Sequence, residues 1–174
     1  MRAWCKGARY SPTATDRFYR GTPAFAFGFG LSYTTFAYSE LQLPQHVQLC
    51  SDIPVSVTVL NSGSVVADHS VQVYISQQNN ASSAATPVVR LVAFTKLHQL
   101  KPAQRATALL LIKASAMAQV NEYGERTLGP GTFVASVNGW QGPGQGRAIS
   151  GMGNVLSMSF ELVGVERALS ACHD

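Results

Sequence analysis

The sequence predicts an all-β protein built as an antiparallel β-sandwich, and three observations carry that prediction. Apolar and polar residues alternate along several short segments, which is the pattern of strands with one buried face. These segments recur at short, regular intervals, with clusters of turn-forming residues between them. The chain has 174 residues, 46% of them hydrophobic, so it is long enough to bury a core.

The first clear strand pair lies in residues 53–75. Residues 53–59 alternate strictly, the sequence NSGS (Asn61 to Ser64) supplies a turn, and residues 71–75 repeat the alternation. This pattern places Val57 and Val73 on the inward faces of two adjacent strands, with Ser56 on the opposite face. A polar loop without periodicity follows and ends at Pro87.

The later elements follow the same logic. The run 106–117 is rich in Ala and Leu and favours a helix by propensity alone, but its place between turns in a series of strands favours a strand. A Gly-rich loop contains Trp140, an aromatic residue that either anchors the loop or contacts a sugar. The predicted further strands are 88–97, 106–117, 132–138 and 156–162. The predicted organisation is a linker over 1–40, a sandwich over 41–165 and a tail over 166–174.

The stretch FAFGFGLSYTTF, which begins at Phe25, is the most unusual part of the sequence. Alternation places the rings of Phe25, Phe27 and Phe29 on one face. Gly28 and Gly30 weaken an ordinary strand, because they pack no side chain. The residues alone leave three interpretations open: a core strand, an exposed platform that stacks on sugars, or a strip that docks between two domains.

Continued as FAFGFGLSYTTFAYSEL, this stretch closely resembles the segment of family-3 glycoside hydrolases that joins the α/β-sandwich catalytic domain to a C-terminal fibronectin type III-like domain. VSVTVLNSGSVVADHSVQVYI resembles the first strand pair of that domain, LVAFTKLHQLKPAQ its next strand and turn, and LGPGTFVASVNG a late turn and strand. The resemblance covers roughly Arg17 to Asn138. It implies a fibronectin type III-like (immunoglobulin-like) sandwich with an irregular N-terminal linker.

The resemblance also implies a function. The family's retaining hydrolysis uses an Asp nucleophile and an acid/base Glu on domains that would precede Met1, and RFYRGTP is nearer the β-xylosidase branch than most β-glucosidases. We therefore expect an accessory domain that stabilises catalytic domains of the same chain, is inactive alone and needs no cofactor. The residues expected to dock between the domains are Phe25, Phe27, Gly28, Phe29, Gly30, Tyr33 and Phe36. The alternative is a standalone adhesion or carbohydrate-binding sandwich.

The sequence departs from the family's pattern at four positions. Ala26 stands where the family usually has Pro, and Asp68, Ala93 and Ala103 stand where it usually has Gly. Glycines at such positions serve turns and close packing, so local geometry is expected to differ there.

No residue is predicted to be catalytic or to bind a metal. Retaining hydrolysis needs two carboxylates roughly 5 Å apart, and the acidic residues fall near turns, exposed strand faces or the tail, as surface carboxylates do. They are Asp52, Asp68, Glu122, Glu125, Glu161 and Glu166. The histidines show neither metal spacing nor a nucleophile motif, so we expect surface residues at His46, His69, His98 and His173. Free thiols are expected at Cys5, Cys50 and Cys172, with one disulfide and a leftover thiol as the alternative.

Composition excludes several other classes of function. The net charge of +4 is concentrated before the first strand and not on a folded face, so nucleic-acid binding is not expected. No apolar run is long enough to span a membrane, and the first twenty residues lack the apolar region of a signal peptide. The sequon at Asn80 has meaning only if the chain is secreted.

Overall fold

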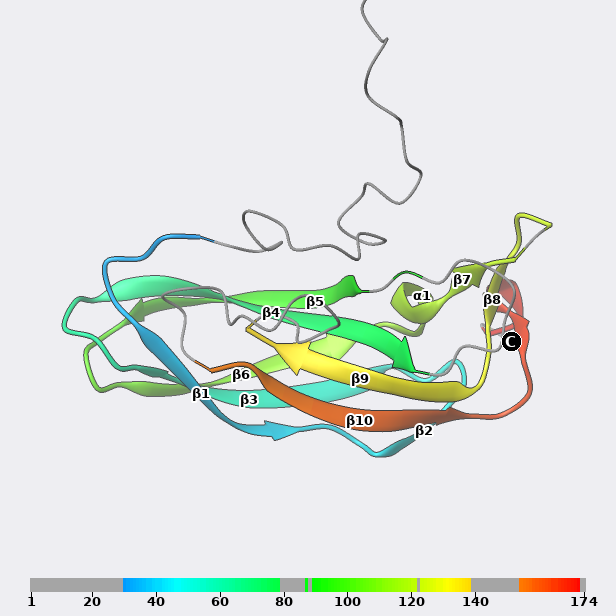
Figure 1. Ribbon diagram of the computed structural model, residues 1–174, viewed down its shortest axis with the longest axis horizontal. Helices are drawn as coiled ribbons and strands as arrows, with labels where there is room; N and C mark the ends of the chain where they lie inside the picture. The colour runs from blue at the N-terminus through cyan, green and yellow to red at the C-terminus, as the bar shows by residue number, and fades with distance from the viewer. Residues whose placement is uncertain (1–29, 79–86, 88, 122, 139–153, 173–174) are drawn as a thin grey trace, which may run out of the picture.

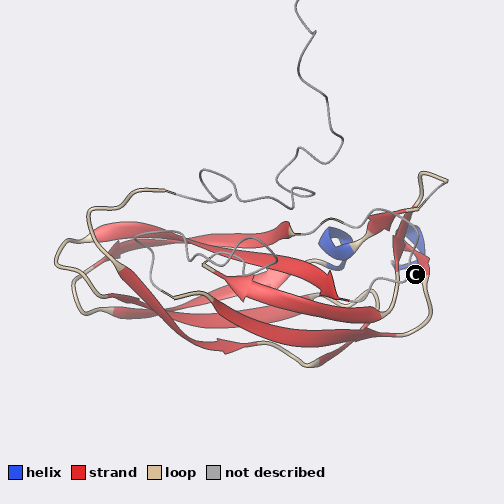
Figure 2. Ribbon diagram, in the orientation of Figure 1, coloured by secondary structure: helices blue, strands red, loops and turns tan. Residues whose placement is uncertain are grey.

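The structure is a computed structural model that describes residues 30–78, 87, 89–121, 123–138 and 154–172. Strands dominate this part of the chain (Figure 2). In order, the elements are β1 (Phe36–Gln42), β2 (His46–Gln48), β3 (Ile53–Asn61), β4 (Ala67–Gln78), β5 (Arg90–Leu100), β6 (Arg105–Ile112), α1 (Ala114–Met117), β7 (Gln119–Val120), β8 (Arg126–Leu128), β9 (Gly131–Val137), β10 (Leu156–Val163), β11 (Arg167–Ala168) and the 3-10 turn η1 (Leu169–Cys172).

Two sheets pack face to face (Figure 1). One has the strand order β1-β3-β6, the other has the order β2-β10-β9-β4-β5, and a small third sheet, β11-β8-β7, lies at one end. Apart from the parallel pair β2–β10, the strand pairs of the described residues are antiparallel. The predicted all-β sandwich is confirmed. No helix among the described residues is long and apolar enough to cross a membrane.

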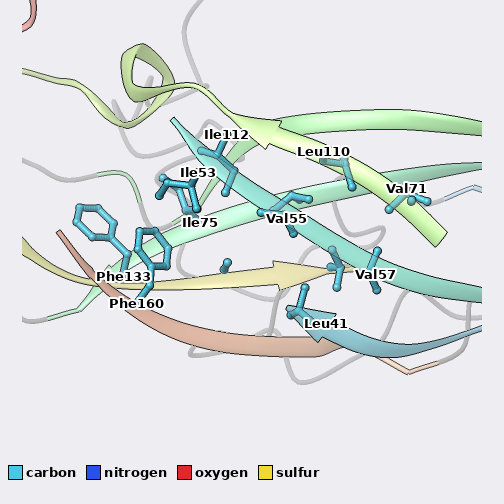
Figure 3. Packing of buried hydrophobic residues seen from close by; sticks show 14 of the residues in the cluster. Leu41, Ile53, Val55, Val57, Val71, Ile75, Leu110, Ile112, Phe133 and Phe160 are labelled. Atoms are coloured by element: carbon cyan, nitrogen blue, oxygen red, sulfur yellow. The ribbon is translucent and has the colours of Figure 1, made fainter. Parts of the chain in front are cut away.

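The alternation predicted for the two central strands is confirmed, but β3 and β4 lie in different sheets and do not pair, so the prediction that Val57 and Val73 lie on adjacent strands is wrong. Val57 pairs with Ala108 across β3–β6, Val73 pairs with Val137 across β4–β9, and both valines are fully buried. Side chains from both layers meet between the sheets (Figure 3), and the rings of Phe133 and Phe160 stack with centroids 5.6 Å apart. The core is therefore built from the apolar positions that alternate along each strand.

A single asparagine joins β1 to the edge of the other layer. The backbone N–H of Tyr38 donates to Oδ1 of Asn154 at 3.0 Å, and Nδ2 of Asn154 donates to the carbonyl of Tyr38 at 2.9 Å. The side chain thus pairs with the strand backbone as a neighbouring strand would, which satisfies both polar groups of Tyr38.

The run 106–117 is divided between two elements. Strand β6 covers its first part, as predicted, but Ala114–Met117 form one helical turn, so the expected strand ends too late. Asp52 explains the change, because its Oδ1 accepts the first free backbone N–H of the turn, from Ala114, at 2.9 Å. The guanidinium of Arg90 donates to the carbonyls of Met117 and Ala118 at the other end.

Three positions where glycine was expected are found at irregular backbone. The β4–β5 ladder shifts register beside Asp68 and again beside Ala93, which are two β-bulges. At the first bulge Gln99 has a positive φ of 51°, and its N–H donates to Oδ1 of Asp68 at 2.9 Å. Ala103 has a φ of 60° in the β5–β6 turn. The expected local departures therefore coincide with real bulges and a turn.

A disulfide joins Cys50, beside β2, to Cys172 in η1, across 122 residues of sequence. The expectation of free thiols is therefore wrong for these two residues, and the alternative of one disulfide holds. Cys5 lies outside the described residues. The bond attaches the end of the described chain, including η1, to the sandwich.

Candidate docking site

The structure divides the expected docking residues into three groups. Phe25, Phe27, Gly28 and Phe29 lie outside the described residues, as does Trp140, the candidate sugar contact. Gly30 is half-buried, at the start of the described chain. Tyr33 and Phe36, only three positions apart, have opposite environments, since Tyr33 is 96% exposed and Phe36 is 1% exposed.

Phe36 is part of this domain's own core. It begins β1, pairs with Asn61 of β3, and stacks on the ring of His69 with centroids 3.9 Å apart. The sandwich thus starts five residues before the expected Leu41. Phe36 and Tyr38 both point inward from β1. The aromatic side chains of this stretch therefore change from exposed at Tyr33 to buried at Phe36, over three residues.

Tyr33 and Leu31 stand in solvent directly before a firmly held segment. Leu31 is 91% exposed. The hydroxyl of Thr34 donates to Oδ1 of Asn61 at 2.7 Å, and the backbone N–H of Ser62 donates to the carbonyl of Thr35 at 2.9 Å. The two exposed side chains therefore directly precede residues 34–35, which are bonded to the end of β3 and to the β3–β4 loop.

Gly63 permits this close approach. A Cβ at Gly63 would meet the Oγ1 of Thr34 and lie 2.8 Å from the backbone nitrogen of Thr35, a separation that real side chains do not show. Any larger residue would push the two segments apart. A glycine is thus required by the contact between residues 34–35 and the loop.

Asn61 organises this end of the sandwich. It is fully buried, its Oδ1 accepts from Thr34 and from the N–H of Gly63 at 3.2 Å, and its Nδ2 donates to the carbonyls of Val65 and Leu100 at 2.8 Å each. Every hydrogen-bonding group of the amide is used, so its burial carries no unsatisfied polar atom.

Exposed apolar side chains lie on the two segments that hydrogen-bond to Asn61. Val65 and Val66 belong to the same loop as Gly63 and are 44% and 51% exposed. We call the four exposed residues of the two adjoining segments the apolar end patch: Leu31, Tyr33, Val65 and Val66. In Figure 1 the β3–β4 loop and the start of β1 lie together at one end of the sandwich.

His69 is buried, contrary to the expectation of a surface residue. It is 3% exposed, its Nε2 hydrogen-bonds the hydroxyl of Tyr38, and burial lowers its pKa to about 4. Burial likewise raises the pKa of Tyr38, with the nearby Tyr74 adding to the effect. The expectation of surface histidines holds for His46 and His98. His173 lies outside the described residues.

The carboxylates whose side chains are described are exposed, as expected, and several have structural partners. Asp68 accepts from the N–H of Gln99, from Lys96 at 2.9 Å and from His98 at 3.1 Å, and these bonds hold its pKa well below the usual range. Asp52 pairs with Lys113 at 2.7 Å. Among the described residues there is no group of three His, Cys, Asp or Glu side chains that could hold a metal ion.

Neither Asn61 nor His69 was recognised from the sequence as a buried residue, although a signal was present. Both are in phase with an apolar row: Asn61 continues the series 53–59, and His69 precedes Val71 and Val73 at the same spacing of two. Polar residues in phase with an inward face indicate buried polar groups with fixed partners.

Comparison with known proteins agrees with this architecture. The family model of the fibronectin type III-like domain matches residues 69–139. A beta-xylosidase of Formosa agariphila is 34% identical over 122 residues, which is 70% of this chain and 16% of that protein. The exo-1,4-beta-xylosidase xlnD of Emericella nidulans is 30% identical over 145 residues, which is 74% of this chain and 18% of that protein.

Solved structures give the same result. The beta-glucosidase of Listeria innocua in complex with glucose superposes with a TM-score of 0.68 at 26% identity, covering 92% of this chain and 20% of that one. Beta-glucosidase 3B of Thermotoga neapolitana gives a TM-score of 0.68 at 28% identity over 87% of this chain and 19% of that one.

The fold and the matched residues define a fibronectin type III-like β-sandwich. The chain belongs to the family-3 glycoside hydrolases, as their C-terminal fibronectin type III-like domain. It spans less than a fifth of the length of these two curated relatives.

Proposed function

We propose that this chain is an accessory domain that stabilises the catalytic domains of a family-3 glycosidase and carries no catalysis itself. One observation carries the proposal: the chain matches less than a fifth of each of two xylosidases, and its described residues form a β-sandwich. The described carboxylates support it, since Asp52 and Asp68 are engaged by backbone and lysine partners at the surface.

The names of the relatives suggest the kind of enzyme. The two curated relatives are β-xylosidases, and the two superposed structures are β-glucosidases. The higher identity to the xylosidases (30% and 34%, against 26% and 28% for the glucosidases) and the RFYRGTP segment together favour a parent enzyme that hydrolyses β-xylosides over one that hydrolyses β-glucosides. The partner of the domain is then the catalytic part of the enzyme.

A domain exchange tests the accessory role. In the Formosa agariphila β-xylosidase, the region that matches this chain is deleted in one variant and replaced by the full 174-residue chain in another. We expect the replacement to restore soluble, active enzyme with a longer half-life at elevated temperature than the deletion. A replacement no better than the deletion contradicts the proposal.

The chain alone gives a second test. We expect no turnover of aryl β-xyloside or β-glucoside, because the reaction needs two carboxylates held close together, whereas the described carboxylates Asp52 and Asp68 are held apart from such a role by lysine and backbone partners. Turnover abolished by substitution of one of its own carboxylates contradicts the assignment. Tight binding of xylo-oligosaccharides by the isolated chain favours the standalone carbohydrate-binding module instead.

A further inference from the structure

We propose that the apolar end patch, Leu31, Tyr33, Val65 and Val66, is the surface through which the sandwich docks on the catalytic part of its enzyme. This inference rests on the proposed function and extends it in one respect. The sequence-based expectation confined docking to the linker, whereas the structure adds the β3–β4 loop of the sandwich itself.

The exposure of the patch is the first step of the argument. Leu31 and Tyr33 are the two most exposed large apolar side chains among the described residues, at 91% and 96%. Val65 and Val66 add half-exposed aliphatic surface on the adjoining segment. Single apolar residues are common on surfaces, but a cluster on two contacting segments marks an interaction site.

The rigidity of the patch is the second step. The hydroxyl of Thr34 and the carbonyl of Val65 both bond to the side chain of Asn61, so one buried amide fixes the backbone of both segments. Gly63 allows the segments to lie in contact. A surface held in this way loses little conformational freedom when it binds, which is the property of a pre-organised docking site.

The position of the patch identifies the partner. Leu31 is joined through Gly30 to the residues before it in sequence, and more than four fifths of each curated relative lies outside the match. The family resemblance implies that the catalytic domains precede this segment, and a partner attached at this end is held at high effective concentration next to the patch. Leu109, which is 75% exposed, lies within β6 and belongs to neither of the two segments of the patch.

The test uses the exchange variant described above, in which this chain replaces the matching region of the Formosa agariphila β-xylosidase. Tyr33→Ser and Val66→Ser are made together in the chain, and Leu109→Ser is the matched control on an exposed position of β6. We expect the double variant to shorten the half-life of xylosidase activity at a fixed temperature about tenfold or more, as the loss of an interface anchor does. The control should leave the half-life unchanged.

Two further measurements separate the alternatives. The urea midpoint of the isolated chain should fall only slightly in the double variant, because Tyr33 is 96% and Val66 51% exposed there; a fall as large as that of Val57→Ala assigns them to the fold itself and overturns the proposal. If the unsubstituted exchange enzyme has a longer half-life than the deletion variant, and the double variant has the same half-life as the unsubstituted one, the patch is not the docking surface, while the accessory role stands. Loss of a chain dimer in sedimentation, with the half-life unaffected, assigns the patch to self-association and also overturns the proposal.

Discussion

The hydroxyl of Thr34 donates a 2.7 Å hydrogen bond to Oδ1 of Asn61, although the two residues are 27 positions apart. Through this bond the segment that leads into β1 is fixed to the end of β3. The same amide also holds the β3–β4 loop and the carbonyl at the end of β5. One buried side chain therefore holds the segment before β1, the β3–β4 loop and the end of β5.

Replacement of Asn61 should be strongly destabilising. Asn61→Ala removes four hydrogen bonds and leaves Leu100 and Thr34 without their partner in the interior, so we expect a loss of about 3 kcal/mol or more. Urea denaturation measures it. The control is Ser62→Ala on the exposed neighbour, which should cost less than about 0.5 kcal/mol. Equal midpoints for the two variants contradict the role assigned to Asn61.

His69 should make stability depend on pH. Its pKa is about 4 in the folded protein, below the ordinary histidine value of 6.5, so the unfolded chain binds more protons between these two pH values. The contribution of the neutral His69 side chain to the free energy of unfolding is fully present above pH 6.5. It is lost as the pH falls towards 4, by up to about 3 kcal/mol. His69→Gln cannot be protonated, so we expect it to reduce this slope in urea titrations at several pH values. A slope in His69→Gln equal to that of the unsubstituted chain contradicts this role of His69.

Val57 and Val73 should each carry a large share of core stability. Both are fully buried on the inward faces of adjacent layers. Truncation of either to Ala should cost on the order of 2 kcal/mol through lost burial and a cavity. Ser56→Ala, on the opposite face of β3, should be nearly silent. Denaturant midpoints that rank the three variants the other way contradict the register.

The Cys50–Cys172 bond should be a major source of stability. It closes a loop of 122 residues, for which the loop-entropy relation gives an upper value of about 5 kcal/mol. We expect Cys50→Ser with Cys172→Ser to lower the thermal midpoint clearly, and Cys5→Ser to leave it unchanged. Thiol titration of the unfolded, unreduced chain should find one free thiol; three would show that the bond is absent.

Much of the fold could be predicted because alternation is a local signal. Alternation predicts the inward positions Val57 and Val73 correctly, but it carries no information on which strands pair, so it does not show that β3 and β4 belong to different sheets. Strand β1 was not predicted in this way, since Glu40 has a positive φ of 56° and the pairing with β3 shifts there. Its inward positions, Phe36, Tyr38 and Leu41, are therefore spaced two and then three residues apart, and the simple period is broken.

The site was less predictable, because contacts between distant segments decide it. Phe36 and Tyr33 belong to one aromatic stretch, and only the pairing of β1 with β3 shows that the first is buried and the second exposed. The Cys50–Cys172 pair has no signal in its spacing. The approach of Gly63 to Thr34 and Thr35 likewise depends on tertiary structure.

Ala103 should be a position where glycine stabilises the protein. The N–H of Gln104 donates to the carbonyl of Lys101 at 3.0 Å, with Pro102 at the second position of the turn and Ala103, at a φ of 60°, at the third. These are the features of a type II turn, which favours glycine at the third position because a Cβ is strained there.

We expect Ala103→Gly to raise the free energy of unfolding by about 1 kcal/mol, since relief of this strain exceeds the added freedom of the unfolded chain. The matched control is Ala106→Gly in β6, where the backbone is extended and glycine should instead destabilise by a similar amount. Both changes remove one methyl group, so they share most of the effect on the unfolded state. Opposite shifts in the urea midpoint therefore distinguish the strained turn from the extended strand, where Ala106 also loses packing against the core. A decrease for both variants would show that the turn does not hold Ala103 in the left-handed region in solution.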